Sequence, residues 1–278
     1  MSDKSRIEWT DATWNPVTGC SKVSPGCAHC YAETLSLRFG WSQRPWLPVY
    51  APENVVLHPE RLDQPLRWRQ PRRVFVNSMS DLFHERVPDA FVHAVFERMA
   101  RANWHTYQIL TKRPERMAGV VDGYYARHPG QRPLDHVWLG TSIENDRWSA
   151  RAEALRETPA AVRFISAEPL LGPLPSLDLT EIDWLIVGGE SGIGARPMDP
   201  AWARQLRDHA VASGTTFFFK QWGGRTPKAG GRELDGRTWD EYPKPVSGPV
   251  PRVPSAKPDV RSFAGHPRRA PRAILAQT

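Results

Sequence analysis

The chain has few cysteines and no long apolar run. Only three of its 278 residues are cysteine, and all three lie within eleven consecutive positions. An odd, clustered set cannot pair into the disulfide framework of a small secreted protein. No apolar stretch approaches the roughly 18 residues of a membrane span, and the first residues lack the apolar core of a signal peptide. We therefore expect a protein of the reducing cytoplasm that does not associate with membranes.

Two common nucleotide-binding motifs are also missing. The chain has no Gly-x4-Gly-Lys-Ser/Thr phosphate loop, and the glycines between positions 188 and 194 lack the Gly-x-Gly-x2-Gly order of a dinucleotide loop. A P-loop enzyme and a Rossmann dehydrogenase are therefore not expected.

The net charge of +7 is unevenly distributed. Residues 246–278 hold six basic side chains and one acidic one, and they are rich in proline and alanine with little apolar periodicity. This composition predicts a disordered basic tail. The tail is either a solvated extension or a non-specific electrostatic contact with nucleic acid. The remaining residues, 1–245, are nearly balanced in charge and are predicted to form one folded domain.

The body of the chain repeats one pattern, in which a short apolar segment ends in a polar or glycine-containing cluster. Such segments are typical of strands buried on both faces of a parallel sheet. They lie at 74–76, 107–110, 137–139, 164–165, 185–187 and 217–219, with a further candidate at 13–19. Helical patterns follow several of them, at 89–102, 148–156 and 202–212. The alternation predicts an α/β fold, a complete or partial (β/α) TIM-type barrel with parallel strands.

Polar residues follow six of these predicted strands. In a barrel of this kind, functional groups gather where the carboxyl ends of the strands meet the next loops. We therefore expect one shared pocket there, although each carboxylate could instead serve in a buried ion pair. The six residues are Asp81, Lys112, Glu144, Glu168, Glu190 and Lys220.

The cysteines have the spacing Cys20-x6-Cys27-x2-Cys30. Three thiolates on one loop can hold three corners of a metal site. A structural zinc requires a fourth ligand, for which His29 and His58 are candidates. Electron-transfer iron–sulfur clusters also use four cysteines, so a [4Fe–4S] cluster held by three leaves one iron open. Both alternatives remain, with the iron–sulfur cluster favoured by the number of cysteines.

The segment from Asn15 to Ala32, with Asn-Pro, Gly-Cys and Cys-x2-Cys-Tyr-Ala, resembles the radical S-adenosylmethionine enzymes. It is similar to the cysteine segment of their spore photoproduct lyase-like branch. Over 7–245 the chain is similar to a phage-associated family of uncharacterised proteins with a three-cysteine motif. Further segments that carry this resemblance lie at 76–84, 110–116, 166–173, 187–192 and 218–223.

Two features of the cysteine segment depart from the usual radical motif. The first gap between cysteines is six residues instead of three, and a turn at 24–26 could absorb the extra length. In addition, His29 occupies the place of an aromatic residue, where it could pack against a cluster or ligate a metal.

The resemblance implies an enzyme that uses a [4Fe–4S] cluster, S-adenosyl-L-methionine and an external electron donor to generate a 5′-deoxyadenosyl radical, which then abstracts hydrogen from a substrate. The implied cluster ligands are Cys20, Cys27 and Cys30. The cofactor-binding residues we expect are Ser78, Ser80, Asp81, Glu144, Gly188, Gly189 and Glu190. The catalytic residues we expect are Lys112, Glu168 and Lys220.

The substrate is unknown, and a nucleic acid or a nucleotide is favoured. Part of the reason is an aromatic and basic segment, in which Trp41, Trp46 and Trp68 lie among arginines and could stack on bases or form an ordinary loop shell. The alternative is a non-catalytic nucleic-acid-binding protein stabilised by zinc or by a cluster.

Overall fold

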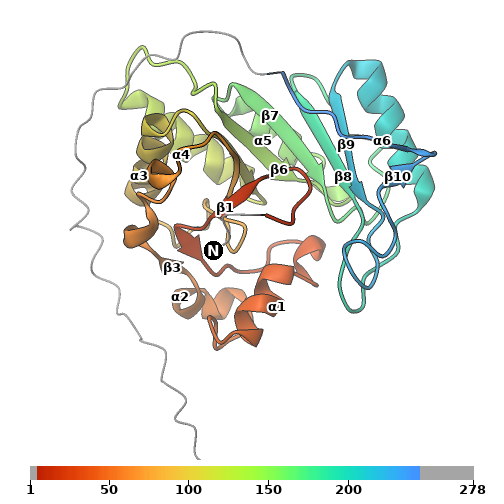
Figure 1. Cartoon of the computed structure of the whole chain (residues 1–278), viewed down its shortest axis with the longest axis horizontal. Helices are drawn as coiled ribbons and strands as arrows, with labels where there is room; N and C mark the ends of the chain where they lie inside the picture. The colour runs from red at the N-terminus through yellow and green to blue at the C-terminus, as the bar shows by residue number, and fades with distance from the viewer. Residues whose placement is uncertain (1–4, 245–278) are drawn as a thin grey trace, which may run out of the picture.

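A computed structural model describes residues 5–244, so the predicted tail at 246–278 lies outside the described residues. Seven parallel strands form one curled sheet with helices on its outer face (Figure 1). The strands follow the order of the chain across the sheet: β1 (Ala12–Trp14), β4 (Arg73–Val76), β5 (Thr106–Thr111), β6 (Val137–Ser142), β7 (Val162–Ala167), β8 (Trp184–Gly188) and β9 (Thr216–Gln221). Within the described residues β1 and β9 do not pair, so the sheet is a partial barrel.

The helices link consecutive strands, as parallel neighbours require. They are α1 (Tyr31–Arg38), α2 (Ala51–Asn54), α3 (Asp89–Arg101), α4 (Pro114–Ala126), α5 (Arg151–Glu157) and α6 (Pro200–Ser213). Helices α3 to α6 cover the outside of the sheet, whereas α1 and α2 lie apart from them, at the lower side of the view (Figure 1). Two short antiparallel pairs complete the structure, β2 (Val17–Thr18) with β3 (Val56–Leu57) and β10 (Glu233–Leu234) with β11 (Arg237–Thr238).

Both faces of the sheet are buried, because side chains alternate along each strand. In β9, Phe217 and Phe219 join the core beneath the helices, and Phe218 points into the barrel. The inner core also contains Trp138, Phe164 and Trp184 from neighbouring strands. Strands apolar on both faces explain why short unbroken apolar segments predicted them correctly.

Most of the predicted elements are confirmed, with local corrections. The seven predicted strands all form, but the candidate at 13–19 is divided into β1 and β2 at Asn15-Pro16, where proline has no N–H to donate. The helix predicted at 148–156 begins at Arg151, after a 3-10 turn over Asp146–Trp148. Helices α1, α2 and α4 are additions to the predicted set.

The start of α6 is stabilised by the two residues at its amino end. The Asp199 carboxylate accepts the Ala201 N–H at 2.8 Å, and Pro200 occupies the first helical position, where its missing N–H has no partner to lose. Among the described helices, none is both long and apolar enough to cross a membrane.

Candidate functional site

A pocket of about 240 Å³ opens at the carboxyl ends of the sheet strands. One wall is the loop that carries the three cysteines, and the other walls are residues at or just beyond the ends of β4 to β9. Its apolar part includes Trp9, Phe75 and Leu110 from the inner core. The pocket is therefore where the barrel topology places a functional site.

All three cysteines are free thiols that line this pocket. Burial raises the pKa of the Cys20 thiol to about 12, helped by the nearby Asp81 carboxylate and opposed by Arg113. Burial also raises the pKa of Cys30. The loop leaves β2 through Gly19, whose φ is +80° and where a Cβ would lie 1.8 Å from the Asn54 carbonyl oxygen. Glycine is therefore required at the entrance to the cysteine loop.

Glu144 holds one side of the cysteine loop from outside the pocket. Its carboxylate is fully buried, accepts the Ser24 hydroxyl at 2.5 Å, and pairs with Arg151 at 3.0 Å and with Lys112 at 3.5 Å. A Cβ on Gly26 would lie 2.4 Å from a Glu144 oxygen, so the loop backbone packs directly on this carboxylate. Glu144 therefore ties the loop between Cys20 and Cys27 to the end of β6.

Glu190 holds the other side of the same loop. It bonds the His29 ring nitrogen Nδ1 at 2.9 Å and accepts the backbone and side-chain N–H groups of Arg196, both at 2.9 Å. Arg196 in turn donates to the Pro25 carbonyl at 2.9 Å. Burial alone would raise the pKa of the Glu190 carboxyl, but these hydrogen bonds from Arg196 and His29 lower it to about 2. The carboxylate is therefore ionised and committed to partners within the protein.

Asp81 is the centre of a third buried network. One oxygen accepts the Phe83 N–H at 3.0 Å and the Thr111 hydroxyl at 2.8 Å, and the other accepts the Lys112 N–H and an Arg113 guanidinium N–H, both at 3.1 Å. Arg113 also reaches Cys20 Sγ at 3.7 Å. All four contacts of the Asp81 carboxylate are thus made inside the protein, and it acts on Cys20 both directly, through its charge, and indirectly, by holding Arg113.

Lys220 and Glu168 form an ion pair inside the pocket. They come from β9 and from the residue after β7, and both side chains are largely buried. Beside them are the hydroxyls of Ser142 and Ser166, which are opposite each other in the β6–β7 ladder. Ser166 is fully buried, and its hydroxyl has no hydrogen-bond partner. An unsatisfied buried hydroxyl on a pocket wall is suited to a bound molecule.

The structure brings most of the predicted site residues together. Eleven of the thirteen line the pocket: Cys20, Cys27, Cys30, Ser78, Ser80, Asp81, Lys112, Glu168, Gly189, Glu190 and Lys220. The other two do not line it. Glu144 lies behind the cysteine loop, and Gly188 lies within β8, where a Cβ would be 3.3 Å from the Glu168 carboxyl carbon. The roles assigned to these residues remain predictions.

A family model described as "Protein of unknown function (DUF5131)" matches residues 4–243. The chain belongs to this family. Its members are thus defined by the whole described barrel rather than by the cysteine segment alone.

Solved structures of spore photoproduct lyase are similar to this DUF5131 chain in fold. A cysteine mutant of that enzyme is 15% identical, with a TM-score of 0.41, and the match covers 68% of this chain and 58% of that chain. Spore photoproduct lyase complexed with dinucleoside spore photoproduct is also 15% identical, with a TM-score of 0.37, covering 70% and 59%. The chain therefore spans less than two thirds of the length of these structures. No curated protein matches it.

Several residues of the site in this DUF5131 protein escape prediction from the sequence. Arg113 follows Lys112 directly, and nothing in the pattern says which of the two cations meets a cysteine. Ser166 lies at the end of an apolar segment, where a hydroxyl looks like an ordinary strand terminus. Ser24 contacts Glu144, and Arg196 contacts the Pro25 carbonyl of the cysteine loop. In both contacts the two partners are far apart in the sequence. The contacts of these residues depend on neighbours in the fold, so the local sequence does not predict them.

The cysteines and histidines near the pocket can be compared with the ligands that a structural zinc or a [4Fe–4S] cluster would require. Among residues 5–244, no three His, Cys, Asp or Glu side chains are arranged to hold a single metal ion. His58, one candidate fourth ligand, bonds the Thr18 hydroxyl at 2.8 Å and does not line the pocket. The three cysteines that line the pocket supply the three thiolates that an iron–sulfur cluster with one open iron would use, whereas a tetrahedral zinc would need a fourth ligand.

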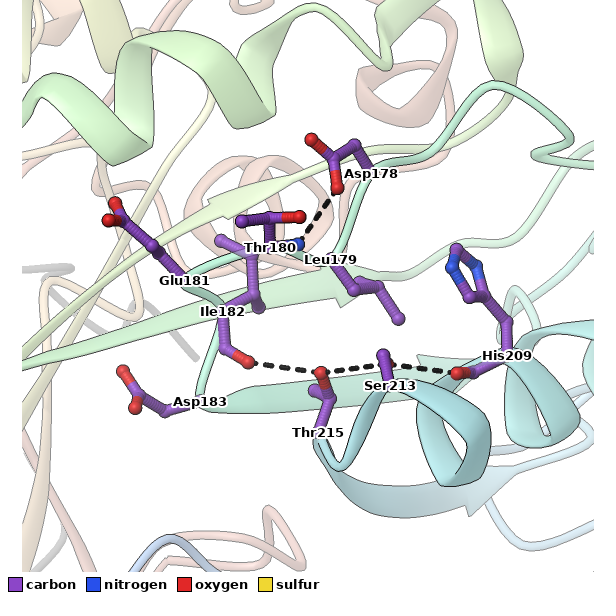
Figure 2. Close-up of a pocket in the computed structure, with 9 residues that line it drawn as sticks. All are labelled: Asp178, Leu179, Thr180, Glu181, Ile182, Asp183, His209, Ser213 and Thr215. Carbon is purple, nitrogen blue, oxygen red and sulfur yellow. Dashed lines mark hydrogen bonds between the residues drawn. The ribbon is translucent and has the colours of Figure 1, made fainter.

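A second hollow lies at the opposite end of the sheet (Figure 2). Its walls are the loop 178–183 before β8 and the end of α6 with the turn before β9. Its polar groups largely bond one another, as in the contacts from Thr215 to the Ile182 carbonyl at 3.1 Å and from Ser213 to the His209 carbonyl at 2.9 Å. These bonds connect α6 to the sheet, which is a structural role at the end of a barrel where function is rare.

Proposed function

We propose that this protein is an enzyme of the radical S-adenosylmethionine type and that its reaction takes place in the cysteine-lined pocket. One observation carries the proposal. Three free thiols from a single loop line the same pocket as a buried hydroxyl without a partner and a lysine–glutamate pair, all at the carboxyl ends of a parallel half-barrel. A purely structural metal site has no need of a pocket with unsatisfied polar walls.

Cys20, Cys27 and Cys30 would hold a [4Fe–4S] cluster, and a cluster with three protein ligands leaves one iron open. When bound, the cluster and S-adenosylmethionine supply the one-electron cleavage that produces a 5′-deoxyadenosyl radical. The rest of the site belongs to the protein, which binds, orients and shields the reactants.

Arg113 adjusts the charge at Cys20. The thiolate is the ligand form of cysteine, and burial disfavours that form. A guanidinium donor at 3.7 Å from Cys20 Sγ offsets this effect because it places a positive charge beside the sulfur. Asp81 fixes the guanidinium at 3.1 Å, so the carboxylate positions the arginine that in turn stabilises the thiolate.

Four further lining residues can orient a polar ligand. Lys220 offers an ammonium group and Glu168 a carboxylate, and a proton can pass between them along their hydrogen bond. Ser142 and Ser166 add hydroxyls on the same side. The apolar groups of Trp9, Phe75 and Leu110 exclude water from the adjoining part of the pocket. This arrangement protects a reactive intermediate from solvent.

Anaerobic reconstitution of the full-length protein with iron and sulfide, followed by reductant and S-adenosylmethionine, tests the proposal. We expect four irons per chain and the release of 5′-deoxyadenosine. Uptake of one tightly bound zinc with no iron–sulfur absorption would instead support the non-catalytic alternative. A full cluster that never cleaves S-adenosylmethionine would refute the proposed activity.

The lysine–glutamate wall has its own test. Lys220→Met should leave iron content unchanged and lower the rate of 5′-deoxyadenosine release, because the ammonium group is not part of the cysteine loop. Lys228→Met is the matched control, since Lys228 is exposed and does not line the pocket. Equal rates in the two variants would remove Lys220 from the reaction.

A further inference from the structure

An exposed aromatic surface adjoins the cysteine-lined pocket. We call it the aromatic platform, and it comprises residues 37–49, from the last two residues of α1 to the segment before α2. Phe39 and Trp41 are 57% and 61% exposed, although both are large apolar side chains that normally lie inside. Their ring centroids are 5.2 Å apart, and the ring planes are inclined by only 31°. The other exposed apolar side chains of the platform are Leu37, Leu47 and Val49.

The charge of the platform is entirely positive. No acidic residue occurs between Glu33 and Glu53. The Arg38 guanidinium lies over the Phe39 ring at 5.7 Å, and that of Arg44 lies over the Tyr50 ring at 5.4 Å. Within residues 5–244, neither guanidinium makes an ion pair with a carboxylate. The platform therefore presents aromatic faces beside unneutralised cations, which is complementary to a polyanion that carries planar groups.

Buried contacts hold the platform in shape. Trp46, in contrast to Trp41, is buried, and its backbone N–H donates to the Glu33 carboxylate at 2.8 Å. Its indole N–H donates to the Ser42 hydroxyl at 3.1 Å. These contacts order the loop before any ligand arrives, which lowers the entropy that binding would cost. Trp68 is also buried, so of the three tryptophans considered for stacking only Trp41 is available.

The platform is connected to the pocket at two points. Trp46 itself lines the pocket, and the Lys22 N–H of the cysteine loop donates to its carbonyl at 3.0 Å. Tyr31, the first residue of α1, also lines the pocket, and Phe39 follows the last residue of the same helix. Eight helical residues correspond to about 12 Å.

We infer that the aromatic platform binds single-stranded nucleic acid, with bases stacked on Phe39 and Trp41 and phosphates at Arg38 and Arg44. A duplex keeps its bases inside and cannot offer their faces to the two rings. Insertion into a membrane fits less well, because the Arg38 guanidinium that lies over the Phe39 ring would enter the apolar layer with it. The inference goes beyond the proposed function, since such binding requires neither a cluster nor S-adenosylmethionine.

Fluorescence anisotropy of the full-length protein with a labelled 12-nucleotide oligothymidylate tests the inference. Each lost base–aromatic stack should weaken binding about 5- to 150-fold, so Trp41→Ala and Phe39→Ala should each show a loss in this range. Arg38→Gln should reduce the slope of log affinity against log salt by about 0.7, the value for one phosphate of a single strand.

Matched controls are Val211→Ala, which removes an exposed apolar group on α6, and Arg127→Gln, which removes an exposed cation just after α4. Both should bind as the wild type does, and circular dichroism should show that every variant is folded. Unchanged affinity in the Phe39→Ala, Trp41→Ala double variant would overturn the inference. Equal affinity for a 12-base-pair duplex, or a loss seen only with anionic phospholipid vesicles, would also overturn it. Release of 5′-deoxyadenosine without nucleic acid is a separate measurement, so either proposal can fail alone.

Discussion

Replacing Glu144 with glutamine should destabilise the protein strongly, although the two side chains are nearly equal in size. The carboxylate is fully buried and balances Arg151, which is itself 4% exposed, at 3.0 Å. Removing one partner of a buried ion pair leaves the other charge uncompensated, which costs about 3–5 kcal/mol. The Arg151 guanidinium keeps a contact with the Ser142 carbonyl at 2.8 Å, so we take the lower limit of about 3 kcal/mol.

For a domain of this size, about 3 kcal/mol corresponds to a fall of about 6–12 °C in melting temperature. Thermal unfolding followed by far-ultraviolet circular dichroism measures this fall. Asp178→Asn is the matched control, because Asp178 is an exposed carboxylate that pairs with Arg156 at 3.4 Å. Exposed pairs contribute about 0–1 kcal/mol, so its melting temperature should change by less than about 4 °C.

A double variant separates the ion pair from other effects of the substitution. Glu144→Gln combined with Arg151→Met removes both charges, and it should be less destabilised than the sum of the single variants. In the Glu144→Gln variant, the cysteines should also react faster with a thiol reagent, because Ser24 and Gly26 of the cysteine loop pack against the Glu144 carboxylate. The reasoning is refuted if Glu144→Gln melts within 2 °C of the wild type.

Three further predictions concern the cysteines and the pH dependence of stability. Cys20→Ala, Cys27→Ala and Cys30→Ala should each lose the four-iron cluster, and a variant that retains four irons per chain would exclude its cysteine as a ligand. Burial, with the charge of Arg113, lowers the pKa of His84 to about 4 from an ordinary 6.5. Between pH 6.5 and 4 the unfolded chain therefore binds a proton at His84 more readily than the folded protein does, so the free energy of unfolding should fall as pH drops through this range. Urea titrations of His84→Gln at several pH values should lack this part of the pH dependence. The pKa of Glu190 is lowered to about 2 from 4.5, so the stability it contributes is complete above pH 4.5 and is lost as pH falls towards 2. Acid unfolding of Glu190→Gln should be flatter in that window, and an identical profile would contradict the assignment.

The barrel could be predicted because its strands are buried on both faces. Segments such as 217–219 are apolar at every position, as expected for a strand that is buried on both faces. The polar residue that follows each segment marks the edge of the sheet where the pocket lies. The pocket was predicted for the same reason, since parallel strands bring their carboxyl ends to one edge. Eleven of the thirteen proposed site residues line it.

The partner of each acidic site residue could not be predicted from the sequence. Asp81, Glu144 and Glu190 are equivalent in the sequence, as acidic residues that follow apolar segments. In the fold, Asp81 meets Arg113, Glu144 meets Ser24 and Glu190 meets His29. Each partner comes from another part of the chain, and no local pattern records such pairs. Burial and partner identity therefore separate residues that support the cysteine loop from those that face a ligand.

The gap between β1 and β9 has a mechanical consequence. At the amino end of the barrel it is bridged by the last described residues, because the Phe219 N–H of β9 donates to the Trp239 carbonyl at 2.9 Å and the Tyr242 hydroxyl donates to the Glu8 carbonyl at 3.3 Å. The Arg73 guanidinium adds a contact 4.3 Å above the Tyr242 ring. At the pocket end, the loop after β8 reaches the cysteine loop through Glu190 and Arg196. A force that parted the two sides of the gap would therefore break loop and side-chain contacts and not a strand ladder, because β1 and β9 do not pair within the described residues.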